Sequence, residues 1–315
     1  MSNKYGMRHS LLPAVKLVEQ WENESALNPE LTMQDHAARL RIPDYNYQNM
    51  IALGHRIRDG GDYSQASADL FERWNLPAPW RLDGDWMIVG DIHIPFTDYE
   101  FSSRVGLVAK KWLPSPRRLL IGGDFFSMDN FSSYIQLAKT PTWQEEKACA
   151  KALLDEWLHT FAEIRMILGN HDRRLQKWTM GALNEDDLLA LIVSNPERVQ
   201  MSGFGYCTID TCAGAWRVTH PRNYSINQLA VAEQLALKHD ENIISFHEHH
   251  LGMGWDRYGR KVIVNGGCLV DPDKLAYVKL EDSKSDAMMK GFVMLRDGTP
   301  YIYGDPPMTD WSKWL

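Results

Sequence analysis

The sequence is poor in cysteine and has no long apolar run. Only four cysteines occur in 315 residues, and no two of them form a CxxC pair; they are Cys149, Cys207, Cys212 and Cys268. So few cysteines exclude a disulfide scaffold, and their spacing excludes a thiolate zinc knot. No apolar stretch approaches the ~20 residues that a membrane-spanning helix requires, so we expect no membrane segment.

An excess of positive charge is also missing. The sequence has 34 basic and 41 acidic residues, and 34 − 41 gives a net charge of −7. This excludes a chain coated with positive charge for non-specific nucleic-acid binding, although a local basic patch remains open. Pro13 and Lys16 interrupt the only apolar stretch near the start, which is untypical of a signal peptide. We therefore expect a cytoplasmic protein.

Two regions of different character meet at the proline-rich stretch Leu76–Trp80. Before it, glycine is sparse and the apolar residues recur at helical spacing. This spacing predicts helices over Leu11–Trp21, Leu31–Leu40, with Thr32 as its cap, and Tyr47–Ile57. The predicted organisation is a helical N-terminal domain over residues 1–80, a second domain over 81–305 and a C-terminal tail over 306–315.

After the proline-rich stretch, short apolar strands alternate with longer amphipathic helices, which is typical of an α/β layered fold. The predicted strands are Trp86–Val89, Leu119–Ile121, Ile164–Leu168, Ile243–Phe246, Lys261–Val264 and Gly291–Leu295. The predicted helices are Thr142–Phe161 and Ser225–His239, and the acidic run Glu185–Asp187 predicts a further helix start. We expect Trp311 and Trp314 in the tail to pack back onto the domain or a partner chain, and Cys207 and Cys212 to be buried thiols.

Five short polar segments follow apolar runs, where α/β proteins place functional loops. They are Gly90–His93, Gly122–Asp124, Gly169–Asp172, Thr219-His220 and Phe246–His249. We attribute the leading glycines to sharp turns at the strand ends. Alone, each segment is ordinary: Asn170 or Asp172 could cap a helix, and a single histidine is more often packed or solvated. Five such placements in one chain predict a metal site.

The side chains are carboxylates, imidazoles and one amide oxygen, a set that suits Mn²⁺, Fe, Zn²⁺ or Ni²⁺. They are too many for one ion and suit two ions that share a carboxylate, about 3.5–4 Å apart. Such a centre supplies hydroxide near neutral pH and neutralises phosphate oxygens during attack.

The order Asp-x-His, Gly-Asp, Gly-Asn-His-Asp, His and His-x-His resembles the calcineurin-like metallophosphoesterase superfamily. The resemblance extends over about Asp85 to Tyr303 and is closest to phosphoesterases of phages and prophages, whose later signatures are echoed in Asn265–Leu269 and Lys290–Phe292. It implies a two-sheet β-sandwich flanked by helices, with two divalent ions at its rim. Mn²⁺ is the favoured ion, with Fe, Zn²⁺, Ni²⁺ and Mg²⁺ as alternatives.

The resemblance also implies a role for each motif residue. The first ion would be held by Asp91, His93, Asp124 and His249, and the second by Asp124, Asn170, His220 and His247. His171 would act as general acid to the leaving oxygen or as a cationic stabiliser of the transition state. Asp172 would orient the His171 ring through its other nitrogen. In this set His93 should lie beside His249, and Asn170 beside His220.

The sequence departs from the superfamily pattern at three places. Phe246 stands before His247 where glycine is usual, and it could narrow the approach to the site or repack the adjacent strand. Pro221 follows His220 where the superfamily commonly has glycine. Asp129-Asn130 replaces the Asp-Arg pair of the protein-phosphatase branch, which argues against a protein-phosphatase role.

Arg173 and Arg174 could replace the phosphate-binding arginine that is lost with that pair, or they could form a solvated helix face.

The N-terminal region has a possible helix-turn-helix rhythm. The expected inward residues are Ala37, Ala38, Leu40, Tyr47, Met50, Ile51 and Ile57, and the arginines that could face phosphates are Arg39, Arg41, Arg56 and Arg58. Residues 1–80 carry eight basic and ten acidic residues, and 8 − 10 gives −2, which favours a packing or oligomerisation module over DNA or RNA binding.

The predicted activity is that of a dinuclear metal-dependent phosphoesterase, a hydrolase that attacks phosphate esters with metal-bound hydroxide. Phosphodiesters of nucleotides or nucleic acid are favoured as substrates. The alternatives are a phosphomonoesterase and a non-catalytic nucleic-acid-binding module. The oligomeric state is left open.

Overall fold

The computed structural model describes residues 6–40, 44–58, 78–132, 140–193, 196–275, 288–305 and 308–314. The chain divides into two compact units, Met1–Ala78 and Pro79–Leu315. The division falls within the proline-rich stretch at which the sequence changes character. None of the helices in these ranges combines the length and apolar character that a bilayer crossing needs.

The N-terminal unit contains the helices α1 (Gly6–Leu27), α2 (Met33–Arg39) and α3 (Asp44–Arg58). Helix α2 begins at the predicted cap Thr32, whose side chain accepts a hydrogen bond from Asp35 N while the Asp35 carboxylate accepts one from Thr32 N. The apolar core of this unit draws on all three helices, with Leu17, Val18, Ala37, Tyr47 and Ile51 buried. The three predicted helices are therefore confirmed, with wider bounds for α1 and α3.

One predicted orientation in this unit is wrong. Ala38 is exposed, whereas His36 and Ala37 form the buried face of α2. Arg58 is ion-paired with Glu22 of α1, so its charge is balanced within the unit. Arg39 is exposed, 4.0 Å from Glu24. Arg41 and the side chains of Arg56 and Ile57 lie outside the described residues.

The second unit contains two six-stranded sheets. The first sheet has the order β12-β11-β2-β3-β4-β5. Its strands are β2 (Trp86–Val89), β3 (Arg118–Ile121), β4 (Glu163–Ile167), β5 (Val199–Ser202), β11 (Gly291–Arg296) and β12 (Thr299–Gly304). Strands β2 to β5 run parallel to one another, and β11 and β12 add an antiparallel edge.

The second sheet has the order β1-β6-β7-β8-β10-β9. Its strands are β1 (Arg81–Asp83), β6 (Tyr206–Thr211), β7 (Gly214–Thr219), β8 (Asn242–Ser245), β9 (Leu251–Trp255) and β10 (Val262–Gly266). Strands β7, β8 and β10 are parallel, so their carboxyl ends meet at one edge, as those of β2 to β4 do.

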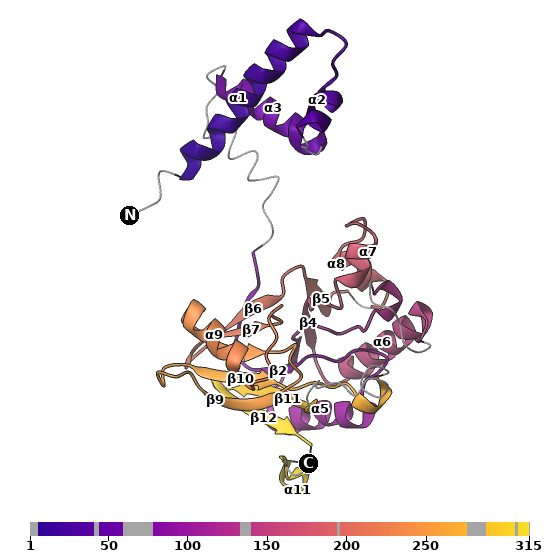
Figure 1. The fold of residues 1–315 in the computed structure, drawn as a ribbon. Coiled ribbons are helices and arrows are strands. Elements are labelled where there is room, and N and C mark those ends of the chain that lie inside the picture. The colour runs from indigo at the N-terminus through magenta and orange to yellow at the C-terminus, as the bar shows by residue number, and fades with distance from the viewer. Residues whose placement is uncertain are drawn as a thin grey trace. The chain divides into compact units, whose positions relative to one another are not determined.

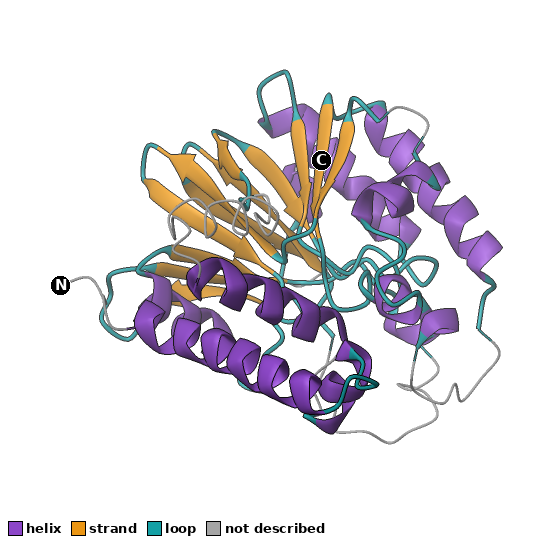
Figure 2. Ribbon diagram, turned by 90° about the horizontal axis from the view of Figure 1, so that it is seen from above, coloured by secondary structure: helices purple, strands orange, loops and turns teal. Residues whose placement is uncertain are grey.

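Helices cover the outer face of each sheet. They are α5 (Tyr99–Trp112), α6 (Trp143–Leu158), α7 (Arg174–Trp178), α8 (Glu185–Ala190), α9 (Ala230–His239) and α11 (Trp311–Trp314), together with the 3₁₀ turns η1 (Asp129–Phe131) and η2 (Pro272–Lys274). Helix α9 packs on β8 and β10, while α5 and α6 lie on the side of the first sheet (Figure 1). The predicted two-sheet β-sandwich flanked by helices is confirmed, and Figure 2 gives a second view of its strands.

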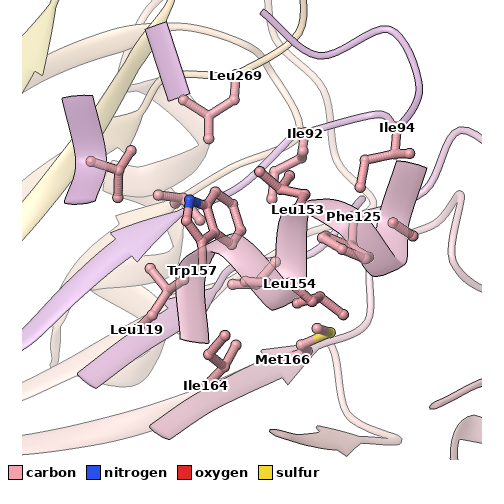
Figure 3. Packing of buried hydrophobic residues seen from close by; sticks show 14 of the residues in the cluster. Ile92, Ile94, Leu119, Phe125, Leu153, Leu154, Trp157, Ile164, Met166 and Leu269 are labelled. Carbon is pink, nitrogen blue, oxygen red and sulfur yellow. The ribbon is translucent and has the colours of Figure 1, made fainter. Parts of the chain in front are cut away.

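Two apolar cores hold these layers together. Between the sheets lie Trp86, Ile88 and Leu120 of the first sheet and Trp216 and Ile244 of the second. The larger core lies under α5 and α6 (Figure 3), where Leu153, Leu154 and Trp157 meet Leu119, Ile164 and Met166, and where Ile92, Ile94 and Phe125 also pack. The loops that follow β2 and β3 are thus anchored by apolar side chains, which fixes the polar residues between them.

The six predicted strands agree with β2, β3, β4, β8, β10 and β11 to within about two residues. The prediction lacked β1, β5, β9 and β12 and gave no bounds for β6 and β7, and the predicted helix Ser225–His239 begins only at Ala230. Cys207 is buried as expected, but Cys212 is exposed because it lies at the β6–β7 turn. Trp311 and Trp314 pack back onto the unit, where both contact Tyr303, as expected.

Candidate metal centre

The polar segments predicted from the sequence meet at one edge of the sandwich. Asp91 and His93 follow β2, Asp124 follows β3, and Asn170 and His171 follow β4. From the second sheet come the residues after β7 and β8, which are His220, His247 and His249. Because β2, β3 and β4 are parallel, as are β7 and β8, all these residues emerge from carboxyl ends of strands.

The backbone is strained at this edge. Asp91, His93, Asp124, His247 and His249 have φ angles of 47°, 48°, 49°, 86° and 55°, in the left-handed region that side chains with a Cβ rarely adopt. Such conformations persist only where the surrounding structure imposes them, and they cluster at functional sites. All five residues were predicted as metal ligands from the sequence.

One half of the cluster is built around Asp91. His249 Nε2 lies 3.4 Å from Asp91 Oδ1, and His93 Nε2 lies 3.8 Å from the same oxygen. Asp91 Oδ2 accepts a hydrogen bond of 2.7 Å from His247 N, which joins the two sheets. Asp91 Oδ1 is buried and makes no hydrogen bond among the described residues. A buried carboxylate oxygen without a donor is costly, and a cation bound between it and the two imidazoles would satisfy it.

Asp124 lies between the two halves. Its Oδ2 atom is 3.2 Å from His220 Nε2 and 3.9 Å from His93 Nε2, while its Oδ1 accepts a hydrogen bond of 2.8 Å from His171 N. Gly169 permits this position, since a Cβ there would lie 2.0 Å from Asp124 Oδ1.

Both proximities expected from the sequence are present. His93 Nε2 lies 3.2 Å from His249 Nε2, and Asn170 Oδ1 lies 3.2 Å from His220 Nε2. Three overlapping groups offer ligand atoms within 4.8 Å of one another: Asp91, His93 and His249; His93, Asp124 and His171; and Asp124, His220 and His247. The residues thus fit two neighbouring cations that share Asp124, and their metal binding stays a prediction.

The electrostatics of the cluster match this interpretation. Burial raises the pKa of Asp124, but His220 and His171 outweigh it, so that the pKa lies well below its usual range. Burial lowers the pKa of His220, and Asp124 more than reverses this, raising the pKa to about 9. Without a cation, a proton on His220 therefore balances the Asp124 carboxylate at neutral pH. A divalent ion must displace that proton to bind.

The His171 ring is paired with groups other than Asp172, contrary to the prediction. The Asp172 carboxylate accepts hydrogen bonds from Phe126 N (3.0 Å) and Gly169 N (2.8 Å), so it braces the two ligand loops. His171 Nδ1 instead lies 2.9 Å from Ser127 O, and its Nε2 lies 3.1 Å from Arg174 Nη2. A carbonyl can only accept and a guanidinium can only donate, so Nδ1 carries the proton and the ring is neutral. Burial lowers the pKa of His171 to about 3, in agreement with this assignment.

The two adjacent arginines diverge. Arg174 Nη1 donates to Asp129 Oδ1 (2.7 Å) and Ser127 O (2.8 Å), which holds its guanidinium beside His171 at the candidate metal centre. Arg173 instead donates from Nη2 to Gly203 O (2.7 Å) and lines a cavity that Asn170 and His220 also line. They therefore do not form one fork for a single phosphate.

Phe246 repacks the inter-sheet core and does not narrow the approach. Its side chain is buried, and its ring fills the space beside three glycines. A Cβ on Gly90, Gly122 or Gly266 would lie 2.5, 2.4 or 2.3 Å from that ring. The strand-end glycines Gly90 and Gly122 are thus explained by close approach of the ring, and the positive φ angles fall on the ligands themselves.

Sequence reasoning missed the groups that support the ligand loops. Glu248, between His247 and His249, accepts hydrogen bonds from Asn265 Nδ2 (3.0 Å) and Ser225 N (3.1 Å). Glu146 of α6 is buried and accepts a hydrogen bond of 2.7 Å from Met128 N, in the loop that follows Asp124. Burial raises the pKa of Glu146 to about 8. The only sequence signal for Glu248 was its place between two histidines, and Glu146 gave none.

Comparison with known proteins gives weak structural similarities only. No family model and no curated protein matches the sequence. Vacuolar protein sorting 29 (Vps29) of Cryptosporidium parvum is similar with 14% identity and a TM-score of 0.37, over 70% of this chain and 96% of that one. Vps29 of Entamoeba histolytica, solved with Zn²⁺, has 13% identity and a TM-score of 0.34, over 70% and 98%.

A phosphatase from Mycoplasma pneumoniae has 12% identity and a TM-score of 0.32, over 74% of this chain and 99% of that one. Values this low identify no family and say nothing about activity. The expected closeness to phage-encoded phosphoesterases stays a prediction.

Proposed function

We propose that the chain is a dinuclear metal-dependent phosphoesterase, a hydrolase of phosphate esters. The observation that carries the proposal is the overlap of three potential ligand groups through His93 and Asp124, on loops whose backbone is held in strained conformations. An overlap of this kind suits two neighbouring ions that share a carboxylate, as phosphoryl-transfer sites use.

The residues of this chain would divide into two sets of ligands. Asp91, His93, Asp124 and His249 would hold one ion, and Asp124, Asn170, His220 and His247 the other. Divalent ions at these positions would lower the pKa of water and neutralise phosphate oxygens. Mn²⁺ is the favoured ion in this proposal, and the oxygen and imidazole set would also accept Fe, Zn²⁺, Ni²⁺ or Mg²⁺.

Arg174 provides a positive charge beside this cluster. Asp129 and Ser127 O orient its guanidinium, and a phosphate oxygen at the His171 side of the cluster would accept a hydrogen bond from it. His171 would contact the substrate on the same side. Its role as general acid requires a proton on Nε2, the atom that now faces Arg174, and stays a prediction.

Phosphodiesters of nucleotides or nucleic acid are the favoured substrates, with phosphomonoesters as the alternative. The support is a cavity of about 650 Å³ that Asn170 and His220 also line, which leaves room for a substituent on the scissile phosphate. Contact of the N-terminal unit with DNA or RNA stays a prediction.

The test uses the full chain with bis(p-nitrophenyl) phosphate as diester and p-nitrophenyl phosphate as monoester, with Mn²⁺ added after chelation. We expect turnover of the diester that falls by about 10³-fold in Asp124→Asn, because a shared ligand is lost. Asp155→Asn, a half-exposed carboxylate on α6, is the matched control and should keep full turnover.

Metal content and turnover together decide among the alternatives. Two bound ions per chain and diester turnover support the proposal. A metal-free protein that binds an oligonucleotide without hydrolysing either ester would instead indicate a non-catalytic binding module.

A further inference from the structure

A basic cavity adjoins the candidate metal centre. Besides Asn170 and His220, the lining of the cavity of about 650 Å³ includes five cationic side chains: Arg173, Lys177, Arg217, Arg222 and Lys238. Among the residues that the structure describes, no aspartate or glutamate lines it. In a chain of net charge −7, a concave wall of one sign is a local feature that focuses its field on anions.

The cations come from separate elements that converge on the cavity. Arg173 and Lys177 stand at the start and on the body of α7, Arg222 lies in the loop after β7, and Lys238 lies near the end of α9. A solvated helix face would place such residues along one helix. With Arg217 on β7, the five cations converge from four segments of the chain, which favours a binding surface.

The nearby acidic groups neutralise only part of this charge. Arg217 is paired with Glu241 at 3.4 Å, and its guanidinium lies over the Tyr206 ring, 3.7 Å from the centroid. Arg222, Lys177 and Lys238 form no ion pair with any carboxylate in the described part of the chain. Asp172 and Glu185 act on Arg173, whose pKa is lowered by burial and by the neighbouring Arg222. Arg173 and Arg222 are thus close enough to repel each other.

We propose that this cavity binds a second phosphate group of the substrate, separate from the phosphate at the candidate metal centre. The same cavity is lined by two predicted ligands, Asn170 and His220, and by Arg222 and Lys177, which have no carboxylate partner among the described residues. One substrate can therefore reach the metal centre and these cations. The inference rests on the proposed phosphoesterase function and narrows its substrates to compounds with at least two phosphate groups. A nucleic-acid strand and a nucleotide with a chain of phosphates share this chemistry.

The first experiment measures binding without catalysis. Fluorescein-labelled octathymidylate is titrated with the full chain in EDTA, and anisotropy gives the affinity. We expect Arg222→Glu and Lys177→Glu to weaken binding by about ten-fold each. Each should also reduce the slope of log affinity against log salt by about one. Lys151→Glu on α6 reverses a charge elsewhere and should change the affinity by less than about two-fold.

Competition in the same assay distinguishes the two sources of the second phosphate. Unlabelled octathymidylate that displaces the probe far better than ADP or pyrophosphate indicates a strand, and the reverse order indicates a nucleotide phosphate chain. Equal affinities of the wild-type chain, Arg222→Glu and Lys177→Glu would overturn the proposal.

The second experiment compares kcat/KM for two substrates with added Mn²⁺. Bis(p-nitrophenyl) phosphate has one phosphate, and a thymidine dinucleotide with a 5′-phosphate has two. In Arg222→Glu, kcat/KM for the dinucleotide should fall by about ten-fold because KM rises, and kcat/KM for the one-phosphate diester should stay unchanged. Equal losses of kcat/KM on both substrates would overturn the second-phosphate site. A wild-type chain that turns over neither substrate would contradict the proposed function, and the binding experiment alone would then test the cavity.

Discussion

In the N-terminal unit, α2 begins at Thr32 with a capping box, and the buried Tyr47 and Ile51 of α3 lie four residues apart, at helical spacing. At the sheet edge, in contrast, Asp91, His93 and Asp124 hold positive φ angles against the preference of their residue types. The helical unit therefore has the capping and apolar spacing that its local sequence predicts. At the sheet edge, each residue with a positive φ angle costs on the order of 1 kcal/mol, and only tertiary packing can stabilise these conformations. A site built this way depends on distant residues more than on its neighbours in sequence.

The largest effect is expected where packing supports the strained loops. Phe246→Ala should lower the free energy of unfolding by about 3–5 kcal/mol, because it leaves a cavity between the sheets. Urea denaturation checks this, with the exposed Tyr258→Ala as control and a change within about 0.5 kcal/mol. If Phe246→Ala costs no more than Tyr258→Ala, the ring does not hold this edge together.

Metal binding should be the next largest effect. Adding Mn²⁺ to the chelated chain at 100 times its Kd should stabilise it by about 2.7 kcal/mol for each independent site. Asp91→Asn should lose much of this gain, because the buried Oδ1 oxygen then lacks its charge. Thermal unfolding with and without Mn²⁺ measures the difference, and Asp155→Asn should respond as the wild-type chain does. An undiminished gain in Asp91→Asn would remove Asp91 from the ligand set.

A pH dependence should come from Glu146, which braces the loop after Asp124. Burial raises its pKa from 4.5 to about 8, so the folded chain keeps a proton that the unfolded chain releases between these values. This contribution to stability is complete below pH 4.5 and is lost as pH rises toward 8, at up to about 1.4 kcal/mol per pH unit.

In Glu146→Gln the free energy of unfolding should therefore fall less steeply between pH 5 and pH 8. The slope should be smaller by up to about 1.4 kcal/mol per pH unit. Urea midpoints across this range give the comparison, with the exposed Glu156→Gln as control. Parallel curves for the wild-type chain and Glu146→Gln would show that Glu146 is ionised throughout.

The smallest effect should lie in the N-terminal unit and stay local. Thr32→Ala should destabilise α2 by about 1 kcal/mol, because Asp35 N loses its acceptor. Hydrogen exchange of the α2 amides should accelerate by about five-fold, while Thr32→Ser should preserve protection. A loss of protection at the sheet edge in Thr32→Ala would contradict the local character of this unit.

The features that the sequence could predict were those with a local signal. Thr32 and Thr142 were visible as helix starts, and apolar runs that end in Asp91, Asp124 or Asn170 indicated strands with ligands at their ends. The order of the strands in space was not visible, since β2 pairs with β3 but also with β11, about two hundred residues later. Short edge strands such as β1, with three residues, carry too little pattern to predict.

The side-chain partners at the site were the hardest to predict. Adjacent residues near the start of a helix point about 100° apart, so Arg173 and Arg174 separate although they are neighbours in sequence. Asp172 was assigned to His171 from a motif, but its partners are backbone amides, one of them at Phe126, 46 positions away. Contacts of this kind depend on the closing of loops in three dimensions, and spacing in the sequence does not encode them.

The ring of Phe246 and the three glycines around it have an evolutionary consequence. The four positions share one volume, so none of them is free to vary alone. A related chain with glycine at position 246 should tolerate alanine or serine at positions 90, 122 and 266, whereas a chain that keeps the aromatic ring should keep all three glycines. Alanine introduced at these positions one at a time should be harmful in this background and mild once the ring is gone.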